Sequence, residues 1–302
     1  MTTVGDMLYQ LGGVPVSAEF TTGSVFFVDS TTGSNSNDGK SPDTAFATLD
    51  FAIGNCTASK SDIIYLMPGH AETTTAIAVD VIGITVKGIG RGTARPTLTA
   101  STTASDLIDI SAASFSMENV LLVGAASGNT GHLHITSADN TFTNVEFQHG
   151  AAPTTSVNIA SGVRNKFHGC RWLGTANGPA ISISFTSATE NDSKDFEVIN
   201  CIFNYGLFGL DTAAITNAAV ATQEGGVILD CVFSGMVATA IDFNSSSSAD
   251  PRGIICGARM TGFGALTIAN VYDNSSYGMV DCLATDAVAS ASPNAIPATT
   301  AS

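Results

Sequence analysis

Basic residues are scarce in this sequence: 11 Lys and Arg residues stand against 26 Asp and Glu residues, so the net charge is −15 at pH 7. Such a surface repels the phosphates of a nucleic acid and the headgroups of an anionic membrane, so we expect neither as a partner. Charged residues make up only 12% of the chain. Hydrophobic residues make up 44%, which is ample for a folded core.

Targeting and metal-binding signals are also lacking. Residues 1–16 have no basic start, and glycines and a proline break their apolar run, so we expect no secretion signal. No apolar run approaches the roughly 20 residues of a transmembrane helix. The cysteines form no C-x-x-C pair, and the histidines do not cluster with acids, so we expect no metal and no cofactor. Residues 35–39 carry alternating oxygen side chains that calcium could use, but a plain turn is favoured because the distal Glu of an EF-hand is missing.

What the sequence does contain is a repeat. A four-residue pattern recurs seven times between residues 119 and 284, at intervals of roughly 24 to 31 residues. Its second residue is small or medium-sized and apolar, and the residue two places later is usually larger. Because alternate residues of a strand face the same side, both columns point to one face. The two columns are Val120, Val145, Cys170, Cys201, Cys231, Ala258 and Cys282, followed by Leu122, Phe147, Trp172, Phe203, Phe233, Met260 and Ala284.

Such a unit cannot bury its apolar face alone, but units stacked at the strand spacing of about 4.8 Å form a continuous core. A second short strand precedes most repeats, and no amphipathic helix accompanies them. The sequence therefore predicts an all-β fold, a single-stranded parallel β-helix. Within it we expect the cysteines to form a buried ladder of free thiols, and Glu146 and Arg171 to form a surface ion pair. The column Asn119, Asn144, Asn200, Asp230 and Asp281 predicts a ladder of side-chain hydrogen bonds at a turn.

We divide the chain into three parts: residues 1–24 as an attachment arm, 25–285 as the β-helix with an N-terminal capping helix, and 286–302 as a low-complexity tail. The cap is expected because an open apolar end would aggregate. The apolar residues that we expect to attach the arm to a larger assembly are Met7, Leu8, Tyr9 and Leu11. An arm that folds back on its own chain is the alternative.

The later repeats are lengthened by connections at equivalent points, and insertions of this kind emerge on one face of a solenoid, often the binding face. Residues 186–195, 216–225, 244–252 and 269–276 form these connections. The candidate binding residues in them are Asn191, Asp192, Asp250, Tyr272 and Asp273. Solvated turns of variable length are the alternative reading.

Catalytic patterns are incomplete. Glycoside hydrolysis generally needs two carboxylates across the bound sugar, and the sequence has no Asp-Asp pair. His149, His168 and the Arg164-Asn165-Lys166 segment resemble parts of such sites, but without the required aspartates. We therefore assign no catalytic residue and expect no enzyme activity.

Residues 27–69 carry a more specific signal. They contain Phe27-Val28-Asp29, Asn37-Asp38-Gly39, Phe46-Ala47-Thr48 and the run from Asp62 to Gly69. This opening resembles that of right-handed parallel β-helix proteins of the pectate-lyase-like superfamily, in particular virion proteins of tailed bacteriophages. The resemblance implies right-handed coils, a homotrimer and a place in the virion, with phage capsid or tail proteins as partners. Enzymes and non-enzymes share the opening, so it indicates fold better than function.

The function that we predict from the sequence is a non-enzymatic phage structural protein, a head decoration or tail appendage that could present a host- or glycan-binding face. The alternative is a carbohydrate-degrading tailspike, or a polysaccharide lyase or hydrolase, whose site would lie between subunits.

Overall fold

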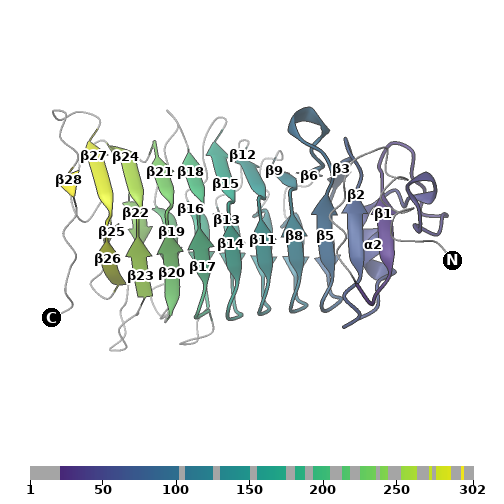
Figure 1. Ribbon diagram of the computed structural model, residues 1–302, viewed down its shortest axis with the longest axis horizontal. Coiled ribbons are helices and arrows are strands. Elements are labelled where there is room, and N and C mark those ends of the chain that lie inside the picture. Colours follow the sequence, from purple (N-terminus) through teal and green to yellow (C-terminus); the bar gives the residue numbers. More distant parts are fainter. Residues whose placement is uncertain are drawn as a thin grey trace.

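The computed structural model describes residues 21–101, 106–124, 130–149, 155–174, 181–187, 193–204, 213–217, 225–235, 239–243, 253–263, 272–273, 277–286 and 294–295. Within these residues, three sheets run side by side along the length of a solenoid (Figure 1). All strand pairs are parallel except the last pair of one sheet. The predicted parallel β-helix is confirmed.

Sheet A contains ten strands in the order β1 (Val25–Val28), β2 (Ile63–Leu66), β5 (Thr85–Gly88), β8 (Ser116–Glu118), β11 (Thr141–Thr143), β14 (Lys166–His168), β17 (Glu197–Ile199), β20 (Gly226–Leu229), β23 (Gly253–Cys256) and β26 (Tyr277–Val280). Sheet B contains β3 (Ala71–Thr74), β6 (Thr97–Ala100), β9 (Leu121–Gly124), β12 (Glu146–His149), β15 (Arg171–Gly174), β18 (Ile202–Asn204), β21 (Val232–Ser234), β24 (Arg259–Phe263), β27 (Leu283–Asp286) and the antiparallel β28 (Asn294–Ala295). Sheet C contains β4 (Ile77–Val79), β7 (Ile108–Ile110), β10 (Leu133–Ile135), β13 (Thr155–Ile159), β16 (Ile181–Phe185), β19 (Ala213–Asn217), β22 (Thr239–Asp242) and β25 (Tyr272–Asp273).

The repeated apolar columns fill the interior as the sequence predicts. Four aromatic rings from successive coils of sheet B lie nearly parallel, with centroid distances of 4.6 Å for Phe147 and Trp172, 4.6 Å for Trp172 and Phe203, and 4.7 Å for Phe203 and Phe233. All four side chains are fully buried. Each ring therefore contacts the coils on both sides, which ties neighbouring repeats together.

The predicted thiol ladder is also present. Cys170, Cys201, Cys231 and Cys282 are free and buried. The Cys201 thiol donates to the carbonyl oxygen of Phe167 at 3.3 Å, and burial raises its pKa well above the ordinary value. The Cys201 thiol therefore stays protonated, and the four buried side chains of the ladder act as small hydrophobic groups.

Two residues join sheet A to sheet B in most coils, and the first of them has a positive φ. The angles are 58° at Asn119, 52° at Asn144, 55° at Asn200, 50° at Asp230 and 52° at Asp281. Gly169 and Gly257 occupy the same place, which shows that the backbone angle selects the residue type. The expected side-chain ladder exists between Asn144 Nδ2 and Asn119 Oδ1, which are 3.1 Å apart.

The predicted cap is the helix α2 (Leu49–Gly54), which covers the first coil with Leu49, Ala52 and Ile53. Its first backbone N–H donates to the buried carboxylate of Glu72 at 2.9 Å, so a side chain of the next coil satisfies the helix start. Two short 3₁₀ helices, η1 (Pro42–Thr44) and η2 (Gly92–Ala94), lie in loops. In the part of the chain that the structure describes, no helix is long and apolar enough to span a membrane.

One predicted contact is wrong. Glu146 and Arg171 do face each other in register, but the ion pair of Glu146 is made with Arg95, at 2.9 Å. The guanidinium of Arg95 reaches Glu146 from a loop between β5 and β6, and this loop has no counterpart in the repeat.

Candidate binding pocket

A loop of residues 89–96 interrupts the regular outline of the solenoid. It connects β5 to β6 through eight residues, where most other coils cross from sheet A to sheet B through two. The close fold of the loop requires glycine at two points. A Cβ atom at Gly88 would collide with the carbonyl oxygen of Asn119, and one at Gly90 with that of Ala94.

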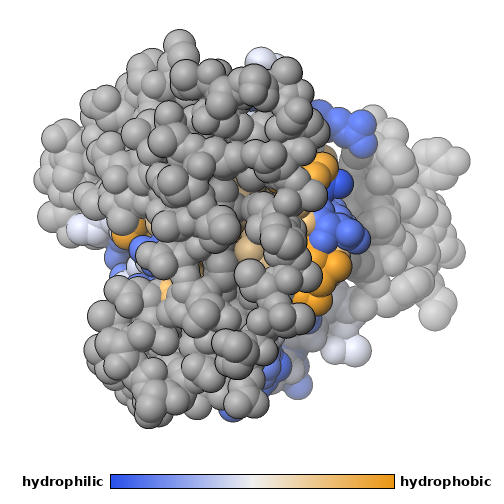
Figure 2. Space-filling model, turned by 90° about the vertical axis from the view of Figure 1, so that its left-hand side faces the viewer, coloured by the Kyte–Doolittle hydropathy of each residue, from blue (hydrophilic) through white to orange (hydrophobic). Residues whose placement is uncertain are grey.

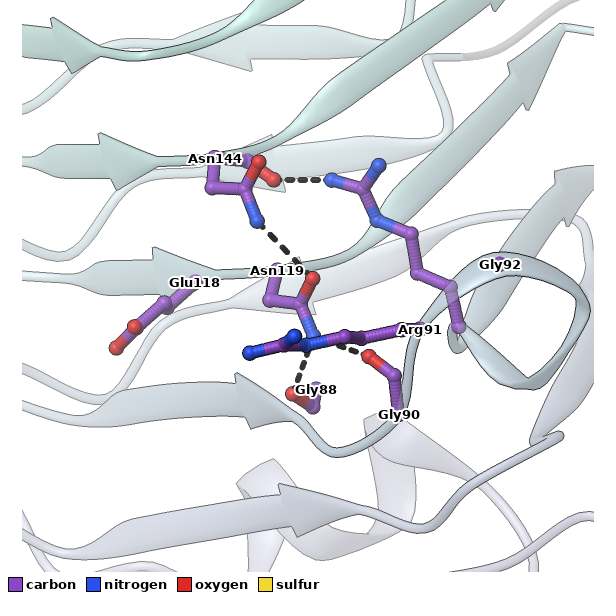
Figure 3. Close-up of a pocket in the computed structure, with 8 residues that line it drawn as sticks. Gly88, Gly90, Arg91, Gly92, Glu118, Asn119 and Asn144 are labelled. Carbon is purple, nitrogen blue, oxygen red and sulfur yellow. Dashed lines mark hydrogen bonds between the residues drawn. The ribbon is translucent and has the colours of Figure 1, made fainter. Parts of the chain in front are cut away.

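A polar pocket of about 510 Å³ lies where this loop rises beside the neighbouring two-residue turns (Figure 3). Three of its lining residues are glycines, and the side chains that line it are all polar or charged. The lining consists of Gly88, Gly90, Arg91, Gly92, Arg95, Glu118, Asn119 and Asn144.

Arg95 fastens the loop to the sheet. Its Nη1 donates to Glu146 Oε2 at 2.9 Å, and its Nη2 donates to the carbonyl oxygen of Asn144. The side chain is only 13% exposed. Burial lowers the pKa of Arg95, and the adjacent Glu146 carboxylate opposes that shift, so the cation is retained and the loop is held in place.

The asparagines of the wall are bound within the protein. Asn119 Nδ2 donates to the carbonyl oxygens of Gly88 at 2.7 Å and Gly90 at 3.0 Å, and its Oδ1 accepts from Asn144. These bonds join the loop to two successive turns. The pocket wall is therefore preformed.

Arg91 differs from the other charged groups of the pocket. Its side chain extends across the pocket beside Asn119 (Figure 3) and is exposed. It makes no ion pair with any residue that the structure describes. The carboxylate of Glu118, by contrast, pairs with Lys87 Nζ at 3.1 Å. The pocket thus offers one free guanidinium, whereas Glu118 and Glu146 each have a cationic partner.

A second polar group lies on the outward face of sheet A. Glu197 accepts hydrogen bonds from Lys166 Nζ at 2.7 Å and His168 Nε2 at 2.9 Å. The hydrogen bond from Lys166 is the main reason why the pKa of Glu197 lies below its ordinary value; His168 also lowers it, against a small effect of burial. Glu197 is thus an ionised surface carboxylate, whereas a general acid needs a raised pKa.

The histidines noted in the sequence lie on different sides of the wall. His149 is buried inside the solenoid, beside His132, with ring centroids 4.8 Å apart. Burial and the neighbouring His132 lower the pKa of His149 well below the ordinary value. His168 points outward, and Arg164 pairs with Asp139 at 2.6 Å. His149, His168 and Arg164 therefore do not form one site.

Residues 35–39 form a turn that uses its own oxygen atoms. Asn35 Oδ1 accepts from the backbone N–H of Ala47 at 2.9 Å, and Asp38 Oδ1 accepts from Thr44 Oγ1 at 2.7 Å. Among the described residues, no group of three or more His, Cys, Asp or Glu side chains could hold a metal ion.

Most of the binding residues predicted from the sequence lie outside the described residues. They are Met7, Leu8, Tyr9, Leu11, Asn191, Asp192 and Asp250. The loop assignment was wrong for Tyr272 and Asp273, because they form strand β25 and pair with Ile241 and Asp242 of β22. The sequence reasoning also missed the pocket. The available signal was Gly88, Gly90 and Gly92 at alternate positions, followed by Arg95, where most other coils have only two residues.

No protein-family model and no curated protein matches the chain. Several solved structures share its fold. The GH136 lacto-N-biosidase from Eubacterium ramulus superposes with a TM-score of 0.60 at 10% identity, and the match covers 87% of this chain and 55% of that protein. Pectate lyase Pel9A gives a TM-score of 0.55 at 12% identity, and the match covers 92% of this chain and 80% of that protein. Geobacillus virus E2 ORF18 gives a TM-score of 0.44 at 11% identity, with 81% of this chain and 59% of that protein covered, and this likeness carries no argument about fold or function. The chain spans about half of the lacto-N-biosidase. The two likenesses with a TM-score above 0.5 show the fold alone.

Proposed function

We propose that the protein is a non-enzymatic structural protein of a phage particle, a head decoration or tail appendage, and that its pocket beside loop 89–96 binds a saccharide. The observation that carries the proposal is the state of the charged groups at the pocket. Arg91 is free to bind a ligand, whereas Glu118 and Glu146 are each paired with a cation. Binding is therefore supported better than acid–base cleavage.

The chemistry of the pocket suits a sugar that carries an acidic group. A guanidinium donates two parallel hydrogen bonds to a carboxylate or sulfate, and the amide-lined wall can bind hydroxyl groups. The wall is built on stacked turns, so little conformational entropy is lost on binding. Proteins with this fold include a pectate lyase and a lacto-N-biosidase, whose names indicate carbohydrate substrates.

The assembly part of the proposal comes from the resemblance of residues 27–69 to virion proteins. It places the chain in a virion as a homotrimer, attached to phage capsid or tail proteins through Met7, Leu8, Tyr9 and Leu11. Its test is cryo-electron microscopy of the purified phage particles. Density for the β-helix on the capsid or tail, with residues 1–24 at the contact, is expected, and absence of the chain from the particles would overturn this part.

The second candidate is a carbohydrate-degrading lyase or hydrolase. It is favoured by the named enzymes of the same fold, which include the catalytic domain of a GH87 α-1,3-glucanase with a TM-score of 0.58. In that case a second subunit or a segment outside the described residues must supply the acid and base.

One experiment separates the two functions. The protein is titrated with neutral and uronic-acid-containing oligosaccharides by calorimetry, and the same mixtures are examined for new reducing ends and for unsaturated products at 235 nm. We expect binding of an acidic oligosaccharide without cleavage. Arg91→Gln should abolish the binding, whereas Arg171→Gln, an exposed arginine of sheet B outside the pocket lining, should retain it. Cleavage products would establish the enzyme instead, and equal binding by both variants would exclude the pocket.

A further inference from the structure

The outward face of sheet A changes character along the solenoid. From β5 to β17 it carries charged and polar side chains, among them Lys87, Glu118, Lys166 and Glu197. From the end of β17 to β26 the outward positions are apolar. They are Ile199, Val227, Leu229, Ile254, Cys256 and Val280, and we call them the apolar face.

These six residues form a continuous surface because their strands are in register. Val227 lies opposite Ile254, and Leu229 lies between Ile199 and Cys256. Ile254 is 39% exposed and Val280 is 42% exposed, and the other four are partly exposed. In the view from the C-terminal end, hydrophobic side chains of the described residues are visible on both sides of the molecule, and the larger group lies on the right (Figure 2).

At the N-terminal end, the apolar side chains on the outward face of sheet A are covered by a loop. There Phe27, Ile63 and Tyr65 also point outward, but the loop that contains Ala45 covers them, and none is more than 9% exposed. Apolar outward positions of sheet A are therefore buried at the N-terminal end, where the loop that contains Ala45 covers them, and exposed at Ile254 and Val280. The apolar face at the C-terminal end has no such cover among the described residues.

The border of the apolar face points to a second copy of this chain as the cover. The three strands β20, β23 and β26, about 4.8 Å apart and four residues long at about 3.3 Å per residue, together with Ile199 at the end of β17, make an apolar area of roughly 200 Å². This is about a quarter of the 800 Å² that each partner contributes to a standard interface. A stable contact therefore needs a polar rim around it, as interfaces commonly have.

The adjoining rim contains charges of both signs. Asp230 and Arg259 lie in successive coils at the junction with sheet B, and Arg259 Nη1 donates to the carbonyl oxygen of Asp281 at 3.1 Å. A two-fold axis along the strand direction reverses the order of the coils in the second copy. It brings the coil of Asp230 against the coil of Arg259 twice, and apolar side chains against apolar side chains. The surface is thus complementary to itself.

We propose that the apolar face packs against the same face of a second copy, with the two solenoids antiparallel and Asp230 of each copy beside Arg259 of the other. A uniformly acidic surface would oppose association of a chain with a net charge of −15, and the absence of charge from this face removes that obstacle. The pairing goes beyond the proposed saccharide binding. It differs from the expected homotrimer, in which the face would meet a different surface of the next copy.

The test measures the mass of the full chain by light scattering over a range of concentrations. We expect a dimer, and a rise of at least about tenfold in its dissociation constant for Ile254→Glu. The control Thr141→Glu places the same charge in the same outward column, four strands away from Ile254 and two strands before β17, where the apolar face begins. It should leave the dimer unchanged. Circular dichroism and thermal unfolding confirm that both variants fold, since both positions point outward.

A charge reversal tests the orientation. Arg259→Glu should weaken the dimer, and the double variant Asp230→Lys with Arg259→Glu should restore it. A monomer at all concentrations, a trimer, or a dimer unaffected by Ile254→Glu would overturn the proposal. Saccharide binding is measured separately with Arg91→Gln, so failure of the dimer leaves the saccharide proposal intact. The dimer and the homotrimer exclude each other, and a measured mass of three chains would support the homotrimer instead.

Discussion

Replacement of Phe203 by Leu removes one ring from the middle of the aromatic stack in sheet B. Phe203 contacts Trp172 on one side and Phe233 on the other, with centroid distances of 4.6 Å and 4.7 Å. Each ring pair contributes about 0.5–1.5 kcal/mol beyond its buried area, so two pairs account for about 1–3 kcal/mol. The incomplete fit of Leu adds roughly 1 kcal/mol. We therefore expect Phe203→Leu to lower the free energy of unfolding by about 2–4 kcal/mol.

The assay is urea unfolding followed by tryptophan fluorescence. Trp172 is the only tryptophan in the chain, and it lies in the stack, so its emission reports on the coils concerned. The change in free energy is the shift of the midpoint multiplied by the slope, provided the slope is unchanged.

Met260→Leu is the matched control. Met260 is buried in the same column, next to Phe233, and has no ring of its own. A swap that conserves volume here should cost under about 1.5 kcal/mol. If Phe203→Leu proves no more destabilising than Met260→Leu, the stacked rings contribute only their volume, and the reasoning is refuted.

Three further predictions concern buried and turn residues. Burial lowers the pKa of His132 from 6.5 to about 4, although a hydrogen bond from the ring to the Gln148 carbonyl oxygen opposes the shift. The contribution of the neutral ring to the free energy of unfolding should therefore be complete above pH 6.5. It should fall by up to about 3 kcal/mol as the pH drops to 4. Unfolding midpoints across that range check this. His132→Gln should reduce the pH dependence, leaving the part that is due to His149, while the partly exposed His134→Gln should leave it unchanged. Asn200 has φ 55°, so Asn200→Val should lower the melting temperature through a cost of about 1–2 kcal/mol, whereas Asn200→Gly should change it little; equal melting temperatures would contradict the turn argument. Arg95→Met should release loop 89–96 by lowering the free energy of local opening of the loop by about 1 kcal/mol. Trypsin should then cut after Arg91 roughly fivefold faster. An unchanged cutting rate would show that Arg95 does not hold the loop.

The core could be predicted from the sequence because its physical cause is periodic. Strand alternation and the stacking of repeats place Phe147, Trp172 and Phe203 in one column, and the structure has them there. The positive φ at Asn119 and Asn144 could also be anticipated in part, since Asn, Asp and Gly recur at one position of the repeat.

The pocket could not be predicted in the same way because it depends on a segment that does not repeat. The strand register places Glu146 opposite Arg171, but the ion pair of the Glu146 carboxylate is formed with Arg95, which lies in loop 89–96. The strand Tyr272–Asp273 was missed for a related reason. It is only two residues long, too short for an alternating pattern to show.

The antiparallel direction of β28 has a consequence for the length of the molecule. A parallel solenoid can in principle be extended at its end by any strand that arrives in the same direction, including one from another molecule. In sheet B that position is already taken by β28, which runs the other way and pairs Ala295 with Leu283 and Asn294 with Ala284. At the opposite end, the bridge between Val28 and Phe46 occupies the edge of β1. End-to-end addition, which would lengthen the rod as the concentration of the protein rises, is thereby opposed at these two edges.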